Sequence, residues 1–177
     1  MNHDNLLVSD YFKTSLADNI LWTSAVVIPR KTIVSGFVFD ETLKCGEDID
    51  LWIRIANTFK VAFSSKVTAH KMIFAEDNHL SLTKNIANLT TVLDKHKSEE
   101  KENPSLKAYL DINRFAIAME AKILKDYGNY NKVKNAIDFK HLNFKLRMLL
   151  LLPSNVLRLL KKIKFFLLKK RLYNSPF

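Results

Sequence analysis

Residues 36–56 read GFVFDETLKCGEDIDLWIRIA, and this stretch decides the expected fold of the first half of the chain. Apolar residues recur at helical spacing in its second part and predict a helix over Glu47–Phe59. Acidic residues crowd the first turn of this helix, where the helix dipole favours negative charge. The preceding segment Gly36–Asp40 predicts a turn or a short extended piece.

Extended segments are expected on both sides of this helix. Ile20–Pro29 reads ILWTSAVVIP, an apolar and β-branched run that predicts a strand ending at a proline. Val61–Ile73 holds two β-rich runs around a Ser-Ser turn. We therefore expect residues 1–80 to form a mixed α/β region and residues 81–139 to form a helical region.

Helices are expected through the middle of the chain. Leu80–Lys97 is one candidate, and the polar run Ser98–Pro104 that follows predicts a linker. Pro104 suits the first position of the next helix, which Gly128 would end as a C-cap residue. A shorter helix is expected over Asn129–Ile137.

The net charge of +10 is confined to the C-terminal tail, residues 140–177. All 18 acidic residues lie in residues 1–139, where 18 of the 28 basic residues balance them. The tail holds the other 10 basic residues in two apolar segments, Leu142–Leu152 and Val156–Leu172. The sequence therefore predicts a neutral body with a cationic tail, residues 140–177 forming a third region.

The second tail segment is amphipathic when it is drawn as a helix, a pattern typical of a helix lying on an anionic membrane. A transmembrane span is not expected, because the uncharged run Met148–Pro153 is far short of the ~20 residues needed. Two alternatives stay open, in which the tail packs on the body or binds nucleic acid. The cations expected to face the membrane are Arg158, Lys161, Lys162 and Lys169.

Composition excludes several classes of site. The three glycines are too few for a glycine-rich loop that binds phosphate or a dinucleotide. One cysteine excludes a disulfide framework and a thiolate zinc site. A single cysteine also suits a reducing, cytosol-facing location, which we expect, and residues 1–20 lack the pattern of a secretory signal.

An ordered series of residues in Thr23–Arg54 resembles the family 2 glycosyltransferases of the GT-A fold. In that family a strand with a Thr-Ser pair precedes a Gly-x-Phe-Asp-Glu segment and a helix that starts Gly-Glu-Asp-x-Asp-Leu-Trp-x-Arg. The matching residues here are Thr23-Ser24, Gly36, Phe39-Asp40-Glu41, Gly46-Glu47-Asp48, Asp50-Leu51-Trp52 and Arg54. The resemblance implies the C-terminal part of a GT-A-like nucleotide-diphospho-sugar transferase fold, followed by an all-helical extension.

The resemblance implies that Asp48 is the general base, which takes the proton from the acceptor hydroxyl as sugar is transferred with inversion. Glu47 would be its companion at the site. The alternative is that Glu47, Asp48 and Asp50 are ordinary first-turn acids that complement the helix dipole.

Three further residues of the series would bind the acceptor or support the site. Trp52 matches a position near the acceptor, where its ring could stack on a sugar, and a core tryptophan is the equal alternative. Arg54 could reach a phosphate, although a structural ion pair is favoured. Asp50 completes the string Asp48-Ile49-Asp50, which is not interpreted as the metal-binding D-x-D of the family because it lies inside a helix.

A divalent metal, Mg or Mn, and a nucleotide sugar are implied for the complete enzyme. His70 is the preferred candidate metal ligand, with His79 as the alternative; a structural histidine is the commoner case. The strands and the D-x-D motif of the donor-binding half have no counterpart before Thr23. We therefore expect a C-terminal half, dependent on a separate donor-binding half and inactive alone.

The function expected from the sequence is sugar transfer to a glycan or lipid-linked acceptor in cell-envelope polysaccharide synthesis. The chain would be cytoplasmic and peripheral on the inner face of the cell membrane. One alternative is a non-catalytic, basic, membrane-associated helical protein in which the acidic helix is structural. A nucleic-acid-binding module is the other, although no nucleic-acid-binding motif accompanies the basic tail.

Overall fold

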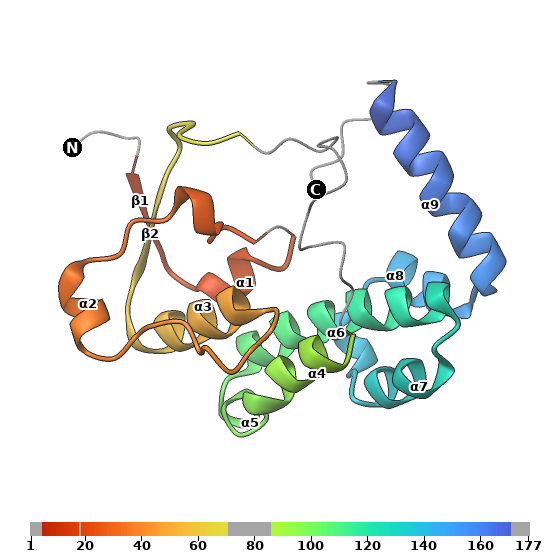
Figure 1. Cartoon of the computed structure of the whole chain (residues 1–177), viewed down its shortest axis with the longest axis horizontal. Helices are drawn as coiled ribbons and strands as arrows, with labels where there is room; N and C mark the ends of the chain where they lie inside the picture. Colours follow the sequence, from red (N-terminus) through yellow and green to blue (C-terminus); the bar gives the residue numbers. More distant parts are fainter. Residues whose placement is uncertain (1–4, 18, 71–85, 171–177) are drawn as a thin grey trace. The chain divides into compact units, whose positions relative to one another are not determined.

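A computed structural model describes residues 5–17, 19–70 and 86–170 of the chain (Figure 1). Its residues fall into two compact units. Unit 1 comprises residues 1–73 and 91–109, and unit 2 comprises residues 74–90 and 110–177. Helices α4 (Ile86–Lys95) and α6 (Pro104–Leu124) contribute residues to both units.

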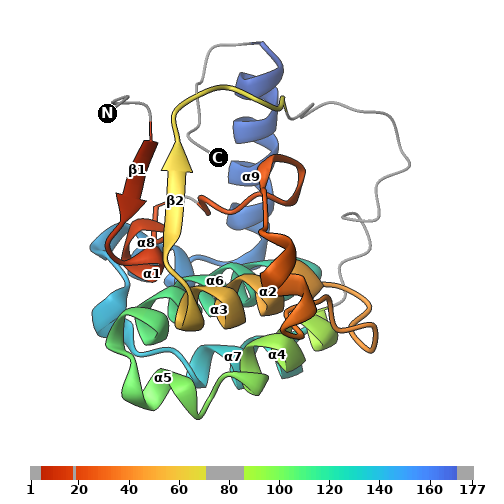
Figure 2. The same ribbon diagram turned by 90° about the vertical axis from the view of Figure 1, so that its left-hand side faces the viewer.

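The described part of unit 1 contains one sheet, an antiparallel pair of β1 (Asn5–Val8) and β2 (Val61–Ser64). Val8 pairs with Val61, and the two strands lie side by side in Figure 2. β2 confirms the first of the two β-rich runs expected after the helix. The second is wrong over residues 66–70, which form no strand, and its residues 71–73 lie outside the described residues. Helix and strand are thus both present, but the described part of the chain is mostly helical and does not show a GT-A fold.

The strand expected over Ile20–Pro29 is wrong. This segment contains a short 3-10 helix, η1 (Thr23–Ala25), and no described strand pairs with it. Val27, in the middle of the β-branched run, is 95% exposed. A β-branched run forms a strand only where a neighbouring strand pairs with its backbone and other side chains cover it. The described residues provide neither for this segment.

Of the described α-helices that lie wholly within unit 1, α3 is long and the others are short. α1 (Tyr11–Thr14) and α2 (Arg30–Val34) are single turns. α3 (Glu47–Thr58) confirms the helix expected at this position to within one residue. α5 (Glu99–Glu102) lies where the sequence predicted a linker, Ser98–Pro104.

The core of unit 1 is built on α3. Leu51, Trp52 and Ile53 are each at most 2% exposed, and burial of such side chains stabilises a fold by roughly 1.5–3 kcal/mol each. An aromatic cluster adds to the core, in which the rings of Tyr11, Phe12 and Tyr109 all contact one another, with centroids 5.2–6.0 Å apart. The first turn of α3 is therefore attached to a rigid part of the unit.

The described secondary-structure elements of unit 2 are all helices. After α4 and α6 follow α7 (Tyr127–Asn135), η3 (Phe139–His141), α8 (Phe144–Leu151) and α9 (Ser154–Lys169). The expected helices over Leu80–Lys97, Asn129–Ile137 and Val156–Leu172 are thus present with shifted ends, and residues 80–85 and 171–172 lie outside the described residues. No helix in the described ranges is both long and apolar enough to cross a membrane.

The expected role of Gly128 as a helix C-cap is wrong. α6 starts at Pro104, as expected, but ends at Leu124, and the next residue, Lys125, adopts a φ of 63°. Gly128 lies inside α7, which begins after Asp126 because the Asp126 side chain accepts the backbone N–H of Asn129. The capping aspartate therefore decides the boundary, and the glycine does not.

Candidate functional site

The series that resembles the glycosyltransferase motif converges on the first turns of α3, within unit 1. Gly46 precedes the helix with a φ of 76°, a left-handed conformation that favours glycine and turns the chain into α3. Glu47 and Asp48 occupy the first turn, and both are half-buried. Their carboxylates therefore lie at the positive end of the helix dipole.

Asp48 meets a residue of the Thr-Ser pair. The Thr23 hydroxyl donates to Asp48 Oδ2 over 3.4 Å, and the backbone N–H of Ile49 donates to Oδ1 over 2.8 Å. Burial, the neighbouring Tyr109 and the charge of Asp48 raise the pKa of Tyr11 far above its ordinary value. Asp48 is thus half-buried, and its charge acts on the nearby Tyr11.

Cys45 lies next to the same acidic turn. Burial, together with the negative charges of Glu47 and Asp48, raises the pKa of its thiol. The protonated thiol is therefore favoured over the thiolate, which is the nucleophilic form.

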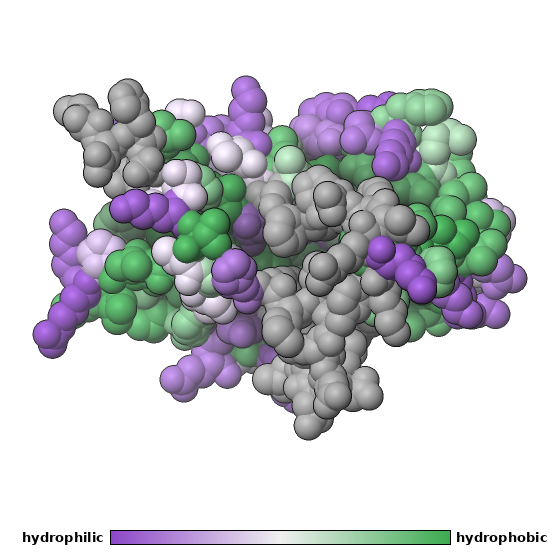
Figure 3. Space-filling view, turned by 90° about the horizontal axis from the view of Figure 1, so that it is seen from above, coloured by the Kyte–Doolittle hydropathy of each residue, from purple (hydrophilic) through white to green (hydrophobic). Residues whose placement is uncertain are grey.

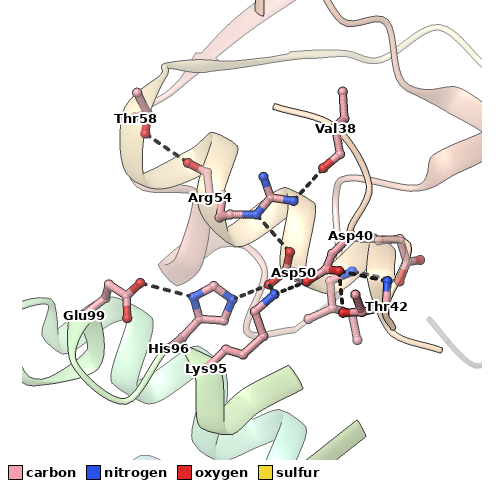
Figure 4. A network of polar contacts seen from close by, with 11 residues as sticks. Val38, Asp40, Thr42, Asp50, Arg54, Thr58, Lys95, His96 and Glu99 are labelled. Carbon is pink, nitrogen blue, oxygen red and sulfur yellow. Dashed lines mark hydrogen bonds and ion pairs between the residues drawn. The ribbon is translucent and has the colours of Figure 1, made fainter. Parts of the chain in front are cut away.

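Asp50 has a different environment from Asp48. It is fully buried, and Arg54 Nε and Lys95 Nζ each lie 2.8 Å from its carboxylate oxygens (Figure 4). His96 Nε2 lies 3.2 Å from Oδ1. Burial alone would raise the pKa of Asp50, but the bonds from Lys95 and Arg54 outweigh it and hold the pKa below its usual value. Asp50 therefore remains a buried anion with cationic partners.

The same network fixes the loop that precedes α3. Arg54 Nη2 donates to the backbone oxygen of Val38 over 2.7 Å, and Lys95 Nζ lies 2.7 Å from Asp40 Oδ2. Asp40 also accepts the backbone N–H and the hydroxyl of Thr42. The bonds from Lys95 and Thr42 hold the pKa of Asp40 well below its usual range. The Phe-Asp-Glu segment and α3 are thereby joined.

Lys95 and His96 are the members of this network that sequence reasoning missed. Both lie at the end of α4, and His96 is buried, with its Nδ1 3.5 Å from Glu99 Oε1. A lysine and a histidine near a helix C-terminus are common because they complement the dipole. The sequence therefore offered no distinct signal for their contact with Asp50.

Trp52 belongs to the core rather than to an open surface. Its side chain is 2% exposed, and its ring meets that of Phe39 edge-on, with centroids 6.3 Å apart. The ring is therefore not available to stack on a sugar in this conformation. Arg54 likewise is engaged in the structural ion pair with Asp50, one of the two roles that the sequence left open.

Among the described residues, His70, the expected metal ligand, belongs to no cluster of candidate ligands. His70 is exposed beyond the end of β2, and His79 lies outside the described residues. Among the described residues no group of three or more His, Cys, Asp or Glu side chains could hold a metal ion. The divalent metal implied by the resemblance therefore stays an expectation for the complete enzyme.

A pocket of about 390 Å³ lies at the other end of α3. It is lined by Val8–Phe12, by Ala56–Val61 and by Asn103. Neither Glu47 nor Asp48 lines it, so this pocket is separate from the motif acids.

Unit 2 holds a second buried carboxylate, Asp111, which is fully buried on α6. Arg114 Nη1 lies 3.1 Å and His141 Nδ1 2.7 Å from its oxygens, and the backbone N–H of Asp138 donates to it. The cluster joins α6 to the segment around η3. It therefore stabilises the helical unit.

The expected membrane cations have two kinds of environment. Arg158 donates to the backbone oxygen of Ile123, and Lys161 pairs with Glu120 over 2.8 Å. Lys162 is exposed, and the side chain of Lys169 lies outside the described part of the structure. Two of the four thus bind the body of unit 2.

Comparison with known proteins adds no relative. No family model, no curated protein and no solved structure matches the chain.

Proposed function

We propose that this chain is the acceptor-side, catalytic-base part of an inverting glycosyltransferase resembling family 2. The reaction would transfer a sugar from a nucleotide sugar to a glycan or lipid-linked acceptor in cell-envelope polysaccharide synthesis. Asp48 is the proposed base, and Glu47 supports it.

The observation that carries this proposal is the difference in burial and partners between Asp48 and Asp50 at the start of α3. Asp50 is fully buried and paired with cations, so its charge serves the fold. Asp48 is half-buried and is reached from outside its own helix by the Thr23 hydroxyl at 3.4 Å. A hydrogen bond of this length is weak, and a substrate hydroxyl could replace it. Asp48 is thus the carboxylate suited to chemistry.

The spatial convergence of the motif residues also supports the proposal. Thr23 contacts Asp48, while Arg54 binds the backbone of Val38. Lys95 then joins Asp40 to Asp50. Segments that are separate in the sequence therefore surround one helix start, as expected if they form a single site.

The proposed chemistry needs a base that is charged before the acceptor binds. Asp48 lies in the first turn of α3, at the positive end of the helix dipole. In the transfer step Asp48 takes the proton of the acceptor hydroxyl, and the acceptor oxygen forms a bond to the anomeric carbon. The bond from that carbon to the diphosphate breaks, and the nucleoside diphosphate leaves with the electron pair.

Donor binding is assigned to a separate donor-binding half. No group of three or more His, Cys, Asp or Glu side chains among the described residues could hold a metal ion, and the three glycines are too few for a glycine-rich phosphate loop. We therefore expect the purified chain alone not to transfer sugar. Robust, Asp48-dependent turnover by the purified chain would overturn this part of the proposal.

The proposed location is the cytosolic face of the cell membrane, with peripheral attachment through α9. Lipid-linked acceptors are found at such a surface, which makes this location consistent with sugar transfer. A second candidate function follows from the same helix, whose apolar side chains are exposed. In that candidate the chain is a non-catalytic membrane-associated protein, and the acids of α3 are structural.

Genetic complementation tests the catalytic proposal in the complete cellular system. Cells lacking the chain should change their envelope glycans, and the wild-type chain should restore them. Asp48→Asn should fail to restore them although it accumulates to the same level. Glu102→Gln is the matched control, because it makes the same carboxylate-to-amide change at an exposed site in unit 1, and it should restore them fully.

Two results would count against the catalytic proposal. Glycans unchanged by loss of the chain would remove the link to polysaccharide synthesis. Full restoration by Asp48→Asn would exclude Asp48 as the base and favour the non-catalytic candidate.

A further inference from the structure

One side of α9 holds the helix on the body of unit 2. Leu157 is 3% exposed, and both Nε and Nη2 of Arg158 donate to the backbone oxygen of Ile123, over 2.8 and 2.6 Å. Lys161 pairs with Glu120 on α6. We call Leu157, Arg158 and Lys161 the seat of α9. The seat orients the helix with respect to α6.

The opposite side of α9 is an exposed apolar stripe. With 3.6 residues per turn, the residues of this stripe share a side that is turned away from the seat. They are Val156, Leu159, Leu160, Ile163 and Phe166, with exposed fractions of 39–58%. Figure 3 shows hydrophobic side chains gathered over the α9 region of the surface, with hydrophilic residues beside them. Soluble surfaces rarely leave such a continuous stripe uncovered.

Positive charge borders this stripe. Lys162 and Lys164 are exposed, and helical spacing places one at each edge of the stripe. Residues 140–177 contain no acidic residue. Lysines in this position can bury their stems beside the apolar side chains while their ammonium groups reach anionic groups. The stripe and its rim therefore match a surface that is apolar inside and anionic at its border.

We propose that the stripe of α9 docks on the surface of an anionic lipid bilayer, with Lys162 and Lys164 at the level of the headgroup phosphates. A nucleic acid would satisfy the lysines but leave the apolar stripe in water. A neutral protein groove would cover the stripe but leave the lysines without anions. A bilayer of anionic lipid provides both partners at once.

The seat gives this docking a defined orientation. Because Arg158 and Lys161 bind α6, the helix meets the bilayer while attached to the rest of unit 2. The cations that face the lipid are therefore Lys162 and Lys164, and the seat cations hold the protein body. This inference rests on the proposed membrane location but not on sugar transfer.

Vesicle co-sedimentation of the full chain tests the inference without any sugar nucleotide. Vesicles of phosphatidylglycerol and phosphatidylcholine should bind the chain, and pure phosphatidylcholine should bind it about tenfold more weakly. Leu159→Ser with Phe166→Ser should weaken binding about tenfold, because two inserted apolar side chains are lost. Val27→Ser with Val34→Ser is the matched control: these apolar residues of unit 1 are 95% and 77% exposed, and binding should be unchanged.

A second variant keeps the test decisive if the apolar variant does not fold. Lys162→Gln with Lys164→Gln should weaken binding to anionic vesicles about tenfold and leave binding to neutral vesicles unchanged. The inference is overturned if both pairs of substitutions leave vesicle binding unchanged. It is also overturned if the chain binds RNA or DNA, with steep salt dependence, more tightly than anionic vesicles. Since the assay contains no donor or acceptor, its failure is distinguishable from failure of the catalytic proposal.

Discussion

Lys95 Nζ lies 2.8 Å from Asp50 Oδ1, and this pair joins the end of α4 to the first turns of α3. The same ammonium lies 2.7 Å from Asp40, so one lysine holds both the helix and the loop before it. The arrangement of the motif residues therefore depends on a residue outside the motif.

The first prediction concerns the stability contributed by Lys95. Lys95→Ala should lower the free energy of unfolding by about 2 kcal/mol, because the buried Asp50 loses one of its cations. This value is below that of a fully buried pair, since the Lys95 side chain is 35% exposed. Urea denaturation followed by tryptophan fluorescence is suitable because Trp22 and Trp52 both belong to unit 1.

The control for this measurement is Lys97→Ala, which makes the same substitution two residues later. Lys97 is 55% exposed and pairs with the partly exposed Asp94. Its removal should cost less than about 1 kcal/mol. Equal losses for the two variants would contradict the role given to Lys95.

The second prediction concerns stability at acid pH. The pKa of Asp50 is lowered in the folded chain because the bonds from Lys95 and Arg54 outweigh the effect of burial. A lowered folded-state pKa contributes stability above the unfolded pKa of about 3.9, and this stability is lost as pH falls through the folded-state value. The melting temperature of the wild type should therefore fall below about pH 4.

Asp50→Asn isolates the contribution of this carboxylate. The variant should be less stable at neutral pH, and its melting temperature should fall less steeply between about pH 4 and pH 2. Melting curves followed by circular dichroism across this range provide the measurement. Parallel pH profiles for the two proteins would show that Asp50 does not account for the acid sensitivity.

The third prediction concerns the seat of α9. Leu157→Ala should loosen the helix, because Leu157 is 3% exposed and a buried leucine truncated to alanine typically costs about 2–5 kcal/mol. Amide hydrogen exchange over residues 154–169 should rise, while exchange in the middle of α6 should remain unchanged. Leu159→Ala is the matched control, because Leu159 is 57% exposed. Equal exchange in the two variants would contradict the orientation assigned to α9.

Local patterns predicted α3 well. Its apolar periodicity, its acidic first turn and the glycine before it are all signals within one short segment, and they agree with each other. The start of α6 at Pro104 was predictable for the same reason. The spacing of Asp50 and Arg54, one helical turn apart, also made an ion pair foreseeable.

Features that depend on distant partners were not predictable in the same way. Ile20–Pro29 has the composition of a strand, but a strand also needs a neighbour, which no local pattern can provide. Lys95 and His96 contact Asp50 and so join the end of α4 to α3. Neither segment has a local sequence pattern that predicts this contact. In the sequence, Asp48 and Asp50 are two acids of one turn, and only the fold distinguishes the half-buried carboxylate from the buried one.

We propose that Asp48 is available for chemistry, whereas Asp50 serves the fold. The most direct test compares the free energies of unfolding of Asp48→Asn and Asp50→Asn by urea denaturation at pH 7. We predict a loss of at most about 1 kcal/mol for Asp48→Asn, the usual value of one charge at a helix start. Asp50→Asn should lose about 3 kcal/mol or more, because it disrupts a buried ion pair. A loss for Asp48→Asn as large as that for Asp50→Asn would contradict the claim and make Asp48 a structural residue.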